Sequence, residues 1–290
     1  MNPIAITLVI PNYNGADETI DLLTSISKAN YPQSKLEVIL IDDASTDNSP
    51  YKIKEQFKKI KIIQLKKNKG PAYARNEGIK ASSNDYILSC DNDVIFPKEY
   101  FSNLNKISRK YPNCIIGSKI LEKNTKKLIS EGYFYNKWTA IESGFDKFTA
   151  SREVDFVPAA AMFFPKKTGK FDSEFKFFAE DADFCLSAKE KGIKVIYDPE
   201  LIIEHGKKRV ILDPNRKYYL YYFGKFKLIL KHSNFLQIII SLIFQLFVVP
   251  LWRYLIKGFT LENITLKNKK DYLYLRWKAF FDVIKKESVF

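Results

Sequence analysis

Two aspartates in the sequence Asp91-Asn92-Asp93 have the type and spacing needed to bind a cation. They follow residues 86–90, a run with the length and composition of a buried strand. Two carboxylates this close repel each other unless a cation lies between or beside them. Mg²⁺ and Mn²⁺ prefer oxygen ligands and commonly join carboxylates to substrate phosphates. Because an isolated Asp-x-Asp sequence is usually a solvated acidic turn, the rest of the chain must decide between the two interpretations.

Alternating strands and helices are predicted to position this pair. We expect strands at residues 4–10, 36–41, 60–65 and 86–90, and helices at residues 16–30, at residues 50–59 and after residue 68. This alternation is typical of a parallel sheet with helices on both faces. Polar residues also follow the first two strands, namely Asn12, Tyr13, Asp42 and Asp43. Because ligands bind beyond the carboxyl ends of parallel strands, the sequence predicts a nucleotide site there.

The composition indicates one large globular domain with an appendage, since the chain has 290 residues of which 46% are hydrophobic. Three cysteines without metal-binding spacing suit a reducing compartment. The apolar run at residues 4–10 is too short for a signal peptide, so we expect a mature cytoplasmic amino terminus. The net charge of +14 suits an anionic membrane surface or phosphorylated substrates. We expect no nucleic acid as a partner, because the cations are scattered and no nucleic-acid-binding motif accompanies them.

Further motifs accompany the two aspartates in a fixed order. They are Val9–Gly15, Val38–Asp47, Asn68–Gly70, Ala74–Gly78, Asp91–Asp93, Glu153–Val157, Phe171-Asp172 and Phe178–Cys185. Over about residues 4–206, this set resembles the family 2 glycosyltransferases, in particular the rhamnosyltransferase-like branch of surface-polysaccharide enzymes. The resemblance implies an α/β GT-A fold, Rossmann-like, with a mostly parallel central sheet flanked by helices, and a catalytic domain at residues 1–206. Pro158–Met162 departs from the Ser-Gly-Ala often found in relatives, which affects the predicted acceptor pocket.

The resemblance also implies the reaction. A sugar would move, with inversion, from a nucleotide diphosphate donor to a hydroxyl of a glycan or lipid-linked acceptor in surface polysaccharide or glycoconjugate synthesis. A divalent metal ion, Mn²⁺ or Mg²⁺, would balance the charge of the leaving group. By resemblance, Asp93 is the first metal ligand, Asp91 contacts the donor ribose or metal-bound waters, and His205 lies near the metal and the diphosphate. The alternative for a lone histidine such as His205 is a structural role.

Several residues are implied to bind the nucleotide sugar. They are Pro11, Tyr13, Asp42, Asp43, Lys69, Gly70, Arg75 and Asp91. Tyr13 would stack on the nucleotide base, and Asp43 would accept a hydrogen bond from the ring N–H of that base. Lys69 and Arg75 would reach the diphosphate, Arg75 with its two-pronged guanidinium. The alternatives are packing of Tyr13 within its turn and ordinary surface positions for both cations.

A second acidic group, Glu180-Asp181-Ala182-Asp183, begins a predicted helix that ends at Gly192. The resemblance makes Asp181 the general base that takes the proton of the attacking hydroxyl. Glu180 and Asp183 would then lie on the acceptor side. Acidic residues in a first helical turn are often only caps, and this alternative applies to Asp183.

Residues 207–290 form a basic, aromatic-rich region that we expect to be helical. Residues 233–252 contain no charged side chain and are long enough to cross a bilayer. Cations on both sides favour cytoplasmic positions for both ends, so an interfacial segment or a helical hairpin is the better prediction. We therefore expect residues 218–257 to hold the chain on the cytoplasmic face of the cell membrane as a peripheral or monotopic protein. The alternative is a helix packed on the catalytic domain.

Three other classes of protein remain as alternatives. A polyprenyl-phosphate glycosyltransferase would share the donor site. A sugar nucleotidyltransferase needs a glycine-rich, cationic loop after its first strand, which Pro11–Gly15 does not supply. A degenerate, membrane-bound assembly subunit is disfavoured because Asp91, Asp93 and Asp181 are intact. The motifs specify neither the sugar nor the oligomeric state.

Overall fold

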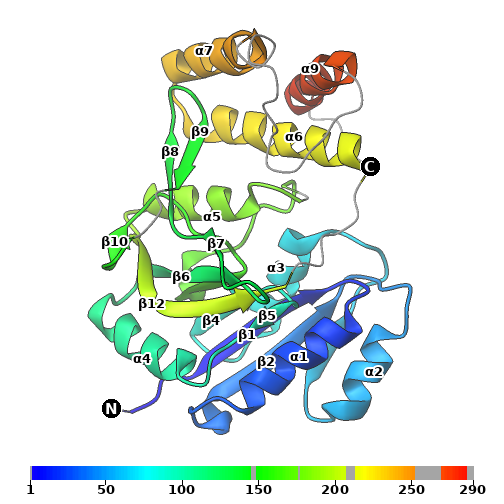
Figure 1. Ribbon diagram of the computed structural model, residues 1–290, viewed down its shortest axis with the longest axis vertical. Helices are drawn as coiled ribbons and strands as arrows, with labels where there is room; N and C mark the ends of the chain where they lie inside the picture. Colours follow the sequence, from blue (N-terminus) through cyan, green and yellow to red (C-terminus); the bar gives the residue numbers. More distant parts are fainter. Residues whose placement is uncertain (1, 145–147, 176, 207–212, 252–268, 286–290) are drawn as a thin grey trace. The chain divides into compact units, whose positions relative to one another are not determined.

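The computed structural model describes residues 2–144, 148–175, 177–206, 213–251 and 269–285 (Figure 1). The chain forms two compact units and passes between them more than once. The first unit comprises Met1–Phe134, Gly144–Ser173 and Asp181–Lys208, and the second comprises Tyr135–Ser143, Glu174–Glu180 and Arg209–Phe290.

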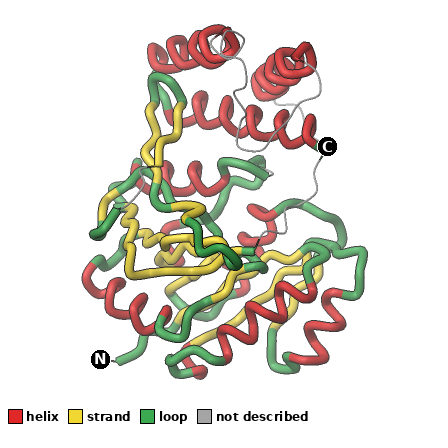
Figure 2. The backbone as a smooth tube through the Cα atoms, in the orientation of Figure 1, coloured by secondary structure: helices red, strands yellow, loops and turns green. Residues whose placement is uncertain are grey.

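A mixed sheet forms the centre of the first unit (Figure 2). Its main strands are β1 (Ile6–Asn12), β2 (Leu36–Asp42), β3 (Lys61–Gln64), β4 (Tyr86–Cys90), β6 (Ile115–Glu122), β11 (Ala161–Pro165) and β12 (Val195–His205). With the short β10 (Arg152–Glu153), they lie in the order β10-β12-β6-β11-β4-β1-β2-β3. The short strands β5 (Val94–Ile95) and β7 (Leu128–Ser130) pair with β12 and β6. The parallel run β4-β1-β2-β3 brings the carboxyl ends of these strands to one side of the sheet.

The helices of the first unit cover both faces of this sheet. They are α1 (Ala16–Ser27), α2 (Ser49–Gln56), α3 (Pro71–Ala81), α4 (Tyr100–Lys110) and α5 (Glu180–Lys189). Leu8 of β1 belongs to the same buried cluster as Leu22 of α1. On α3, a Cβ at Gly78 would lie 2.4 Å from Cγ1 of Val9 in β1. Because successive side chains of a strand point to opposite faces, α1 and α3 pack on opposite sides of β1.

The predicted α/β fold is confirmed, with small differences in the bounds of the elements, and its sheet contains the parallel run β4-β1-β2-β3 within a mixed arrangement. The predicted strand at 86–90 coincides with β4. The predicted first strand at 4–10 is displaced to Ile6–Asn12, because Pro11 and Asn12 continue the ladder opposite Ile41 and Asp42. β11 runs antiparallel to both β4 and β6, so the sheet is mixed on that side.

The second unit is mainly helical. Its described helices are α6 (Pro214–His232), α7 (Phe235–Ile243), the π-helical turn η3 (Phe244–Val248) and α9 (Lys269–Lys285). The loop of the hairpin β8 (Tyr133–Asn136) and β9 (Ile141–Gly144) belongs to the same unit. Asn234 caps α7 in a capping box with Gln237, which explains why a new helix begins after only two intervening residues.

The predicted apolar segment at 233–252 corresponds to α7, η3 and the helical residues up to Leu251. Within the part of the chain that the structure describes, no helix combines the length and the apolar character needed to cross a membrane. Of the predicted 218–257 segment, residues 252–257 lie outside the described residues, and so do the cations at 207–209.

Candidate metal centre and nucleotide site

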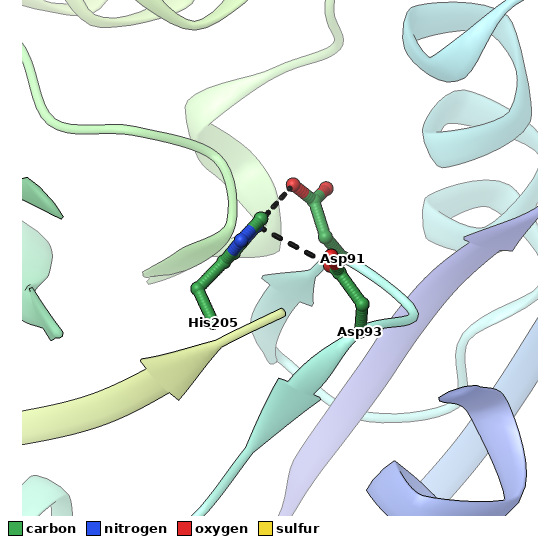
Figure 3. A group of neighbouring side chains, drawn as sticks. All are labelled: Asp91, Asp93 and His205. Atoms are coloured by element: carbon green, nitrogen blue, oxygen red, sulfur yellow. Dashed lines mark hydrogen bonds and ion pairs between the residues drawn. The ribbon is translucent and has the colours of Figure 1, made fainter. Parts of the chain in front are cut away.

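Asp91, Asp93 and His205 lie together at the carboxyl end of β4 (Figure 3). Nε2 of His205 is 3.4 Å from Oδ2 of Asp91 and 3.3 Å from Oδ1 of Asp93. One ligand atom from each residue lies within 4.8 Å of the other two. All three side chains are half-buried, so the group has limited access to solvent.

Strand pairing brings His205 to the aspartates from a distant part of the chain. The end of β12 pairs with β5, and His205 lies opposite Val94. The N–H of Gly206 then donates to the carbonyl of Asp93 at 2.9 Å. A Cβ at position 206 would lie 3.0 Å from Oδ2 of Asp93, so a residue without a side chain suits this close approach.

The three side chains fit a divalent cation. Ligands about 2.1 Å from an octahedral ion are roughly 3 Å from their neighbours, close to the separations around His205. The two carboxylates suit Mn²⁺ or Mg²⁺, and the imidazole suits a transition-metal ion such as Mn²⁺ better than Mg²⁺. Nδ1 of His205 lies 2.9 Å from the carbonyl oxygen of Gly206. A neutral ring that donates from Nδ1 keeps the lone pair of Nε2 for the metal, as is usual for histidine ligands.

The charges of the group are coupled. Burial opposes a charged imidazole, but the hydrogen bond and the negative charge of Asp91, together with Asp93, raise the pKa of His205 to about 9. Burial also opposes ionisation of Asp91, but His205 and Arg75 outweigh it and lower its pKa to about 2. Burial and the charge of Asp91 raise the pKa of Asp93 to about 6. At neutral pH, the imidazolium therefore supplies positive charge that a metal ion would replace.

Arg75 lies inside the first unit and holds Asp91. Its side chain is only 3% exposed. Its Nε donates to Oγ of Ser89 at 3.0 Å, and one terminal nitrogen contacts Oδ1 of Asp91 at 2.7 Å. The other oxygen of Asp91 faces His205. This placement supports a role in positioning Asp91, while the predicted contact with a diphosphate stays a prediction.

The middle residue of the motif, Asn92, fixes the loop to the end of β1. Its Nδ2 donates to Oδ1 of Asn12 at 2.9 Å. Asn12 in turn donates to Asp42 at 3.0 Å and accepts from Thr19, so it joins the ends of three strands to α1. A Cβ at Gly15 would lie 2.2 Å from Nδ2 of Asn92, which explains the glycine there. Sequence reasoning noticed Asn12 only as a polar strand end and assigned no role to Asn92 or Ser89.

The two aspartates at the end of β2 are buried and organise backbone loops. Asp43 is 4% exposed, and its two oxygens accept from the N–H groups of Lys69 at 2.7 Å and Gly70 at 2.8 Å. Burial raises the pKa of Asp43 although these N–H groups oppose the shift. Asp42 accepts from Ser45 and Asn12. The structure thus shows Asp43 holding the loop before α3, and its contact with a base stays a prediction.

The other predicted donor residues surround these loops. Tyr13 follows β1 directly, and its side chain is 46% exposed, as a stacking surface requires. Pro11 is half-buried within β1. Lys69 is exposed, with Nζ 4.5 Å from the ring centre of Tyr73. Gly70 has φ +85 before α3, a conformation that favours glycine.

The second acidic group begins α5, as predicted. Asp181 is half-buried, and its Oδ1 accepts from the N–H of Ala182 at 2.8 Å. Glu180 and Asp183 are 8% and 2% exposed. The preceding Ala179 has φ +68, an uncommon conformation for alanine that starts the helix with a sharp turn. The roles of Asp181 as base and of its neighbours on the acceptor side stay predictions.

Comparison with known proteins identifies the family. The model of Glycosyl transferase family 2 matches residues 7–168, more than half of the chain, and the chain belongs to this family. This confirms the predicted family and enzyme class. Poly(ribitol-phosphate) beta-N-acetylglucosaminyltransferase TarS of Staphylococcus aureus is 32% identical over 97 residues, which are 32% of this chain and 17% of TarS. Poly-beta-1,6-N-acetyl-D-glucosamine synthase of S. aureus is 38% identical over 97 residues, 32% of this chain and 23% of the synthase.

The matched segment therefore spans less than a quarter of each of these relatives. Solved structures extend the likeness to the whole fold. S. aureus TarS 1–349 in complex with UDP-GlcNAc has a TM-score of 0.62 at 18% identity, covering 97% of this chain and 82% of that chain. A mannosyltransferase from Pyrobaculum calidifontis, solved with GDP-Man and Mn²⁺, has a TM-score of 0.62 at 14% identity, covering 99% of this chain and 87% of that chain. The predicted GT-A fold is confirmed, and the rhamnosyltransferase-like branch stays a prediction.

Proposed function

We propose that this glycosyltransferase moves a sugar from a nucleotide diphosphate donor to a hydroxyl of a glycan or lipid-linked acceptor in surface polysaccharide or glycoconjugate synthesis. The acceptor oxygen attacks the anomeric carbon, and the bond from that carbon to the diphosphate oxygen breaks. The proton of the hydroxyl goes to Asp181, and the nucleoside diphosphate leaves. Direct attack with one base inverts the anomeric centre.

The observation that carries this proposal is the meeting of Asp91, Asp93 and His205 at the carboxyl end of β4. The loops after β1 and β2 run beside them, because Asn12 contacts both Asp42 and Asn92. A metal site next to strand-end loops is where a nucleotide diphosphate is expected in an open α/β sheet. Members of the same family supply the reaction class.

Asp93, Asp91 and His205 would hold a divalent cation, which supplies positive charge to the departing diphosphate when it is bound. The chain's own residues prepare this site. Arg75 fixes one oxygen of Asp91, and the carbonyl of Gly206 orients the ring of His205. Asp43 holds the backbone of residues 69–70, which carry the exposed side chain of Lys69. The loop that follows the exposed Tyr13 is held by Ser45, whose hydroxyl accepts from the N–H of Asn14 at 2.9 Å.

The choice of donor and acceptor class is supported by the relatives. TarS is described as a poly(ribitol-phosphate) beta-N-acetylglucosaminyltransferase, and the second relative makes poly-beta-1,6-N-acetyl-D-glucosamine. The related TarS structure holds UDP-GlcNAc, and the related mannosyltransferase structure holds GDP-Man and Mn²⁺. We therefore assign this chain a nucleotide sugar as donor and a surface glycan or its lipid-linked precursor as acceptor.

A panel of nucleotide sugars tests the proposal. The full chain is screened for thermal stabilisation by each nucleotide sugar with Mn²⁺ or Mg²⁺, and with EDTA. A donor that stabilises only with metal is then incubated with lipid-linked acceptors, and the anomeric configuration of the product is measured by NMR. Metal-dependent stabilisation followed by an inverted product supports the proposal. Stabilisation without metal, or a product with retained configuration, contradicts it.

A further inference from the structure

Helix α7 and the turn η3 present an unusual face in the second unit. Their exposed large side chains are Phe235, Leu236, Ile239, Ile240, Ile243, Phe247, Val248 and, just beyond, Leu251. Most of them recur every four residues, so they share one side of the helical segment. Phe235 is 80% exposed, Phe247 57% and Leu251 61%. The segment therefore shows its apolar side outward over its whole described length.

The buried residues of the same segment are Ser241, Gln245 and Leu246, and two of these three are polar. Ser241 is fully buried and Gln245 is 3% exposed. Nε2 of Gln245 donates to the carbonyl of Thr139 at 2.7 Å, and the carbonyl of Gln245 accepts from buried Arg276. An amphipathic helix of a water-soluble protein has the reverse arrangement, with its polar side outward. Packing inside the second unit thus buries the polar residues Ser241 and Gln245 together with Leu246 and leaves the larger apolar side exposed.

The apolar side continues onto α9. Leu273, Tyr274, Phe281 and Ile284 are each at least 45% exposed. Trp277 connects the two helices, because its ring lies 5.6 Å from Phe247 and 5.8 Å from Phe281, centre to centre. We call these exposed residues of α7, η3 and α9 the apolar face. Large contiguous apolar surfaces on soluble proteins mark interaction sites.

The charge of this part of the chain indicates what the apolar face meets. Residues 207–290 contain 17 of the 47 lysines and arginines but only 5 of the 33 aspartates and glutamates. Most of the net charge of +14 therefore belongs to these residues. Two copies of the region would repel each other, whereas a leaflet with anionic headgroups would attract it. An apolar surface with many cations in the same region suits a lipid surface.

We infer that the apolar face of α7, η3 and α9 docks flat onto an anionic lipid leaflet, with the side chains of Phe235 to Leu251 entering the boundary between headgroups and acyl chains. One side only of each helix is apolar, so the helices lie in the plane of the leaflet. The inference does not depend on the proposed transfer reaction, and its test uses no donor or acceptor.

The test measures binding of the full chain to vesicles of phosphatidylcholine with or without phosphatidylglycerol, by co-sedimentation. The test variant combines Phe235→Gln with Ile243→Gln, which are 80% and 51% exposed. The control combines Tyr51→Gln with Ile129→Gln, which are 71% and 49% exposed in α2 and β7 of the first unit. Moving one such side chain from water into an apolar environment raises the partition coefficient roughly tenfold. The test variant loses two of them, so it should bind vesicles on the order of 100-fold more weakly.

The control variant should bind like the wild type, and anionic vesicles should bind more protein than neutral ones. Equal binding of the test variant and the wild type would overturn the inference, and so would failure of the wild type to bind anionic vesicles. A dimer in sedimentation velocity that is lost only in the test variant, without vesicle binding, would assign the face to a second copy instead. Equal melting temperatures of all variants establish that the changes act on binding and not on folding.

Discussion

At the carboxyl end of the sheet, charged side chains lie inside the first unit, whereas on α7, η3 and α9 apolar side chains lie outside the second unit. Asp42, Asp43 and Arg75 are each less than 5% exposed. Phe235 and Leu251 are each more than 60% exposed. Buried charge and exposed apolar surface both cost free energy in the isolated protein, the first through lost hydration and the second through ordered or displaced water.

This contrast between the sheet end and the apolar face indicates how each region gains free energy on binding. Every charged group named above at the sheet end has partners with fixed geometry, so that region is prepared for a ligand of defined shape and charge. The apolar face offers exposed apolar surface instead of polar groups held in a fixed geometry, so it suits a fluid surface without a defined shape. Changes at the sheet end should therefore alter binding and turnover steeply, and changes on the apolar face should alter only partitioning to lipid.

Asp93→Ala should have the largest effect. It removes the predicted first metal ligand, so metal-dependent donor binding and sugar transfer should both be lost, because a metal contributes several kcal/mol to stabilising a departing phosphate group. Donor affinity in Mn²⁺ is measured by calorimetry. Asp85→Ala, an exposed aspartate before the other end of β4, is the matched control. Unchanged donor affinity of the Asp93 variant in Mn²⁺ would refute the metal assignment.

Asp181→Asn should lower turnover by ~10²–10⁴, the usual contribution of general base catalysis, because an amide accepts a hydrogen bond but does not take a proton. Metal-dependent donor binding should stay as in the wild type, which separates this variant from Asp93→Ala. Single-turnover transfer with a saturating donor is the measurement. Transfer near the wild-type rate would place the base elsewhere, with Asp183 and Glu180 as the next candidates.

Arg75→Gln should weaken metal binding by about 10–100-fold, the usual effect of losing a group that holds a metal ligand. The guanidinium fixes one oxygen of Asp91 and keeps the pKa of that carboxyl low. Arg75→Lys keeps the charge but loses one of the two hydrogen bonds, so it should fall between Arg75→Gln and the wild type. Arg109→Gln on α4 is the control. Equal metal affinity in all four proteins would show that Arg75 does not position Asp91.

The pH dependence of metal binding should follow His205. Its pKa is about 9, so below that pH a proton occupies the nitrogen that a metal needs. Metal affinity should therefore rise by about tenfold per pH unit between roughly pH 7 and pH 8, with about one proton released per ion bound. Protonation of Asp93, with a pKa of about 6, should steepen the loss of affinity at lower pH. Calorimetry with Mg²⁺ in buffers of different ionisation enthalpy measures the proton release.

His205→Asn is the control for this pH dependence, because an amide offers an oxygen ligand that does not titrate in this range. Its metal affinity should be weaker and nearly constant between pH 7 and pH 8. A wild-type affinity that is also constant over this range would exclude His205 as a ligand.

The smallest effect is expected on donor affinity when the apolar face is changed. Phe235→Gln combined with Ile243→Gln should change donor affinity by less than about twofold, as exposed substitutions usually do. The same protein should lose vesicle binding. A large loss of donor affinity in this variant would show that the apolar face and the donor site are not independent, and would break the comparison.

Much of the fold was predictable because local pattern and burial agree. The run at 86–90 was predicted as a strand and forms β4, with residues 87–90 fully buried. The start of the helix at residue 180 was predictable from its acidic first turn. The predicted first strand was placed too early, because proline is usually read as the end of a strand, yet Pro11 lies in β1 beside Ile41.

The apolar segment shows a second limit of sequence reasoning. The missing charges in residues 233–252 predicted a membrane-associated segment, and the described residues up to Leu251 form helices with an exposed apolar side. Which side faces outward could not be predicted, because buried Gln245 contacts Thr139 and Arg276. Those partners lie far away along the chain.

The sequence by itself determined the alternation of strands and helices and the polar residues at the strand ends, because both depend on neighbours within a few positions. The resemblance implied the residues of the candidate metal centre, but only the tertiary structure shows the contacts that bring them together. His205 is 114 positions from Asp91 and reaches it through the pairing of β12 with β5. The buried guanidinium of Arg75 contacts Ser89 and Asp91 at the end of the neighbouring strand, which local sequence did not predict, while its contact with a diphosphate stays a prediction. Such choices depend on contacts between distant segments, which only the folded chain brings together.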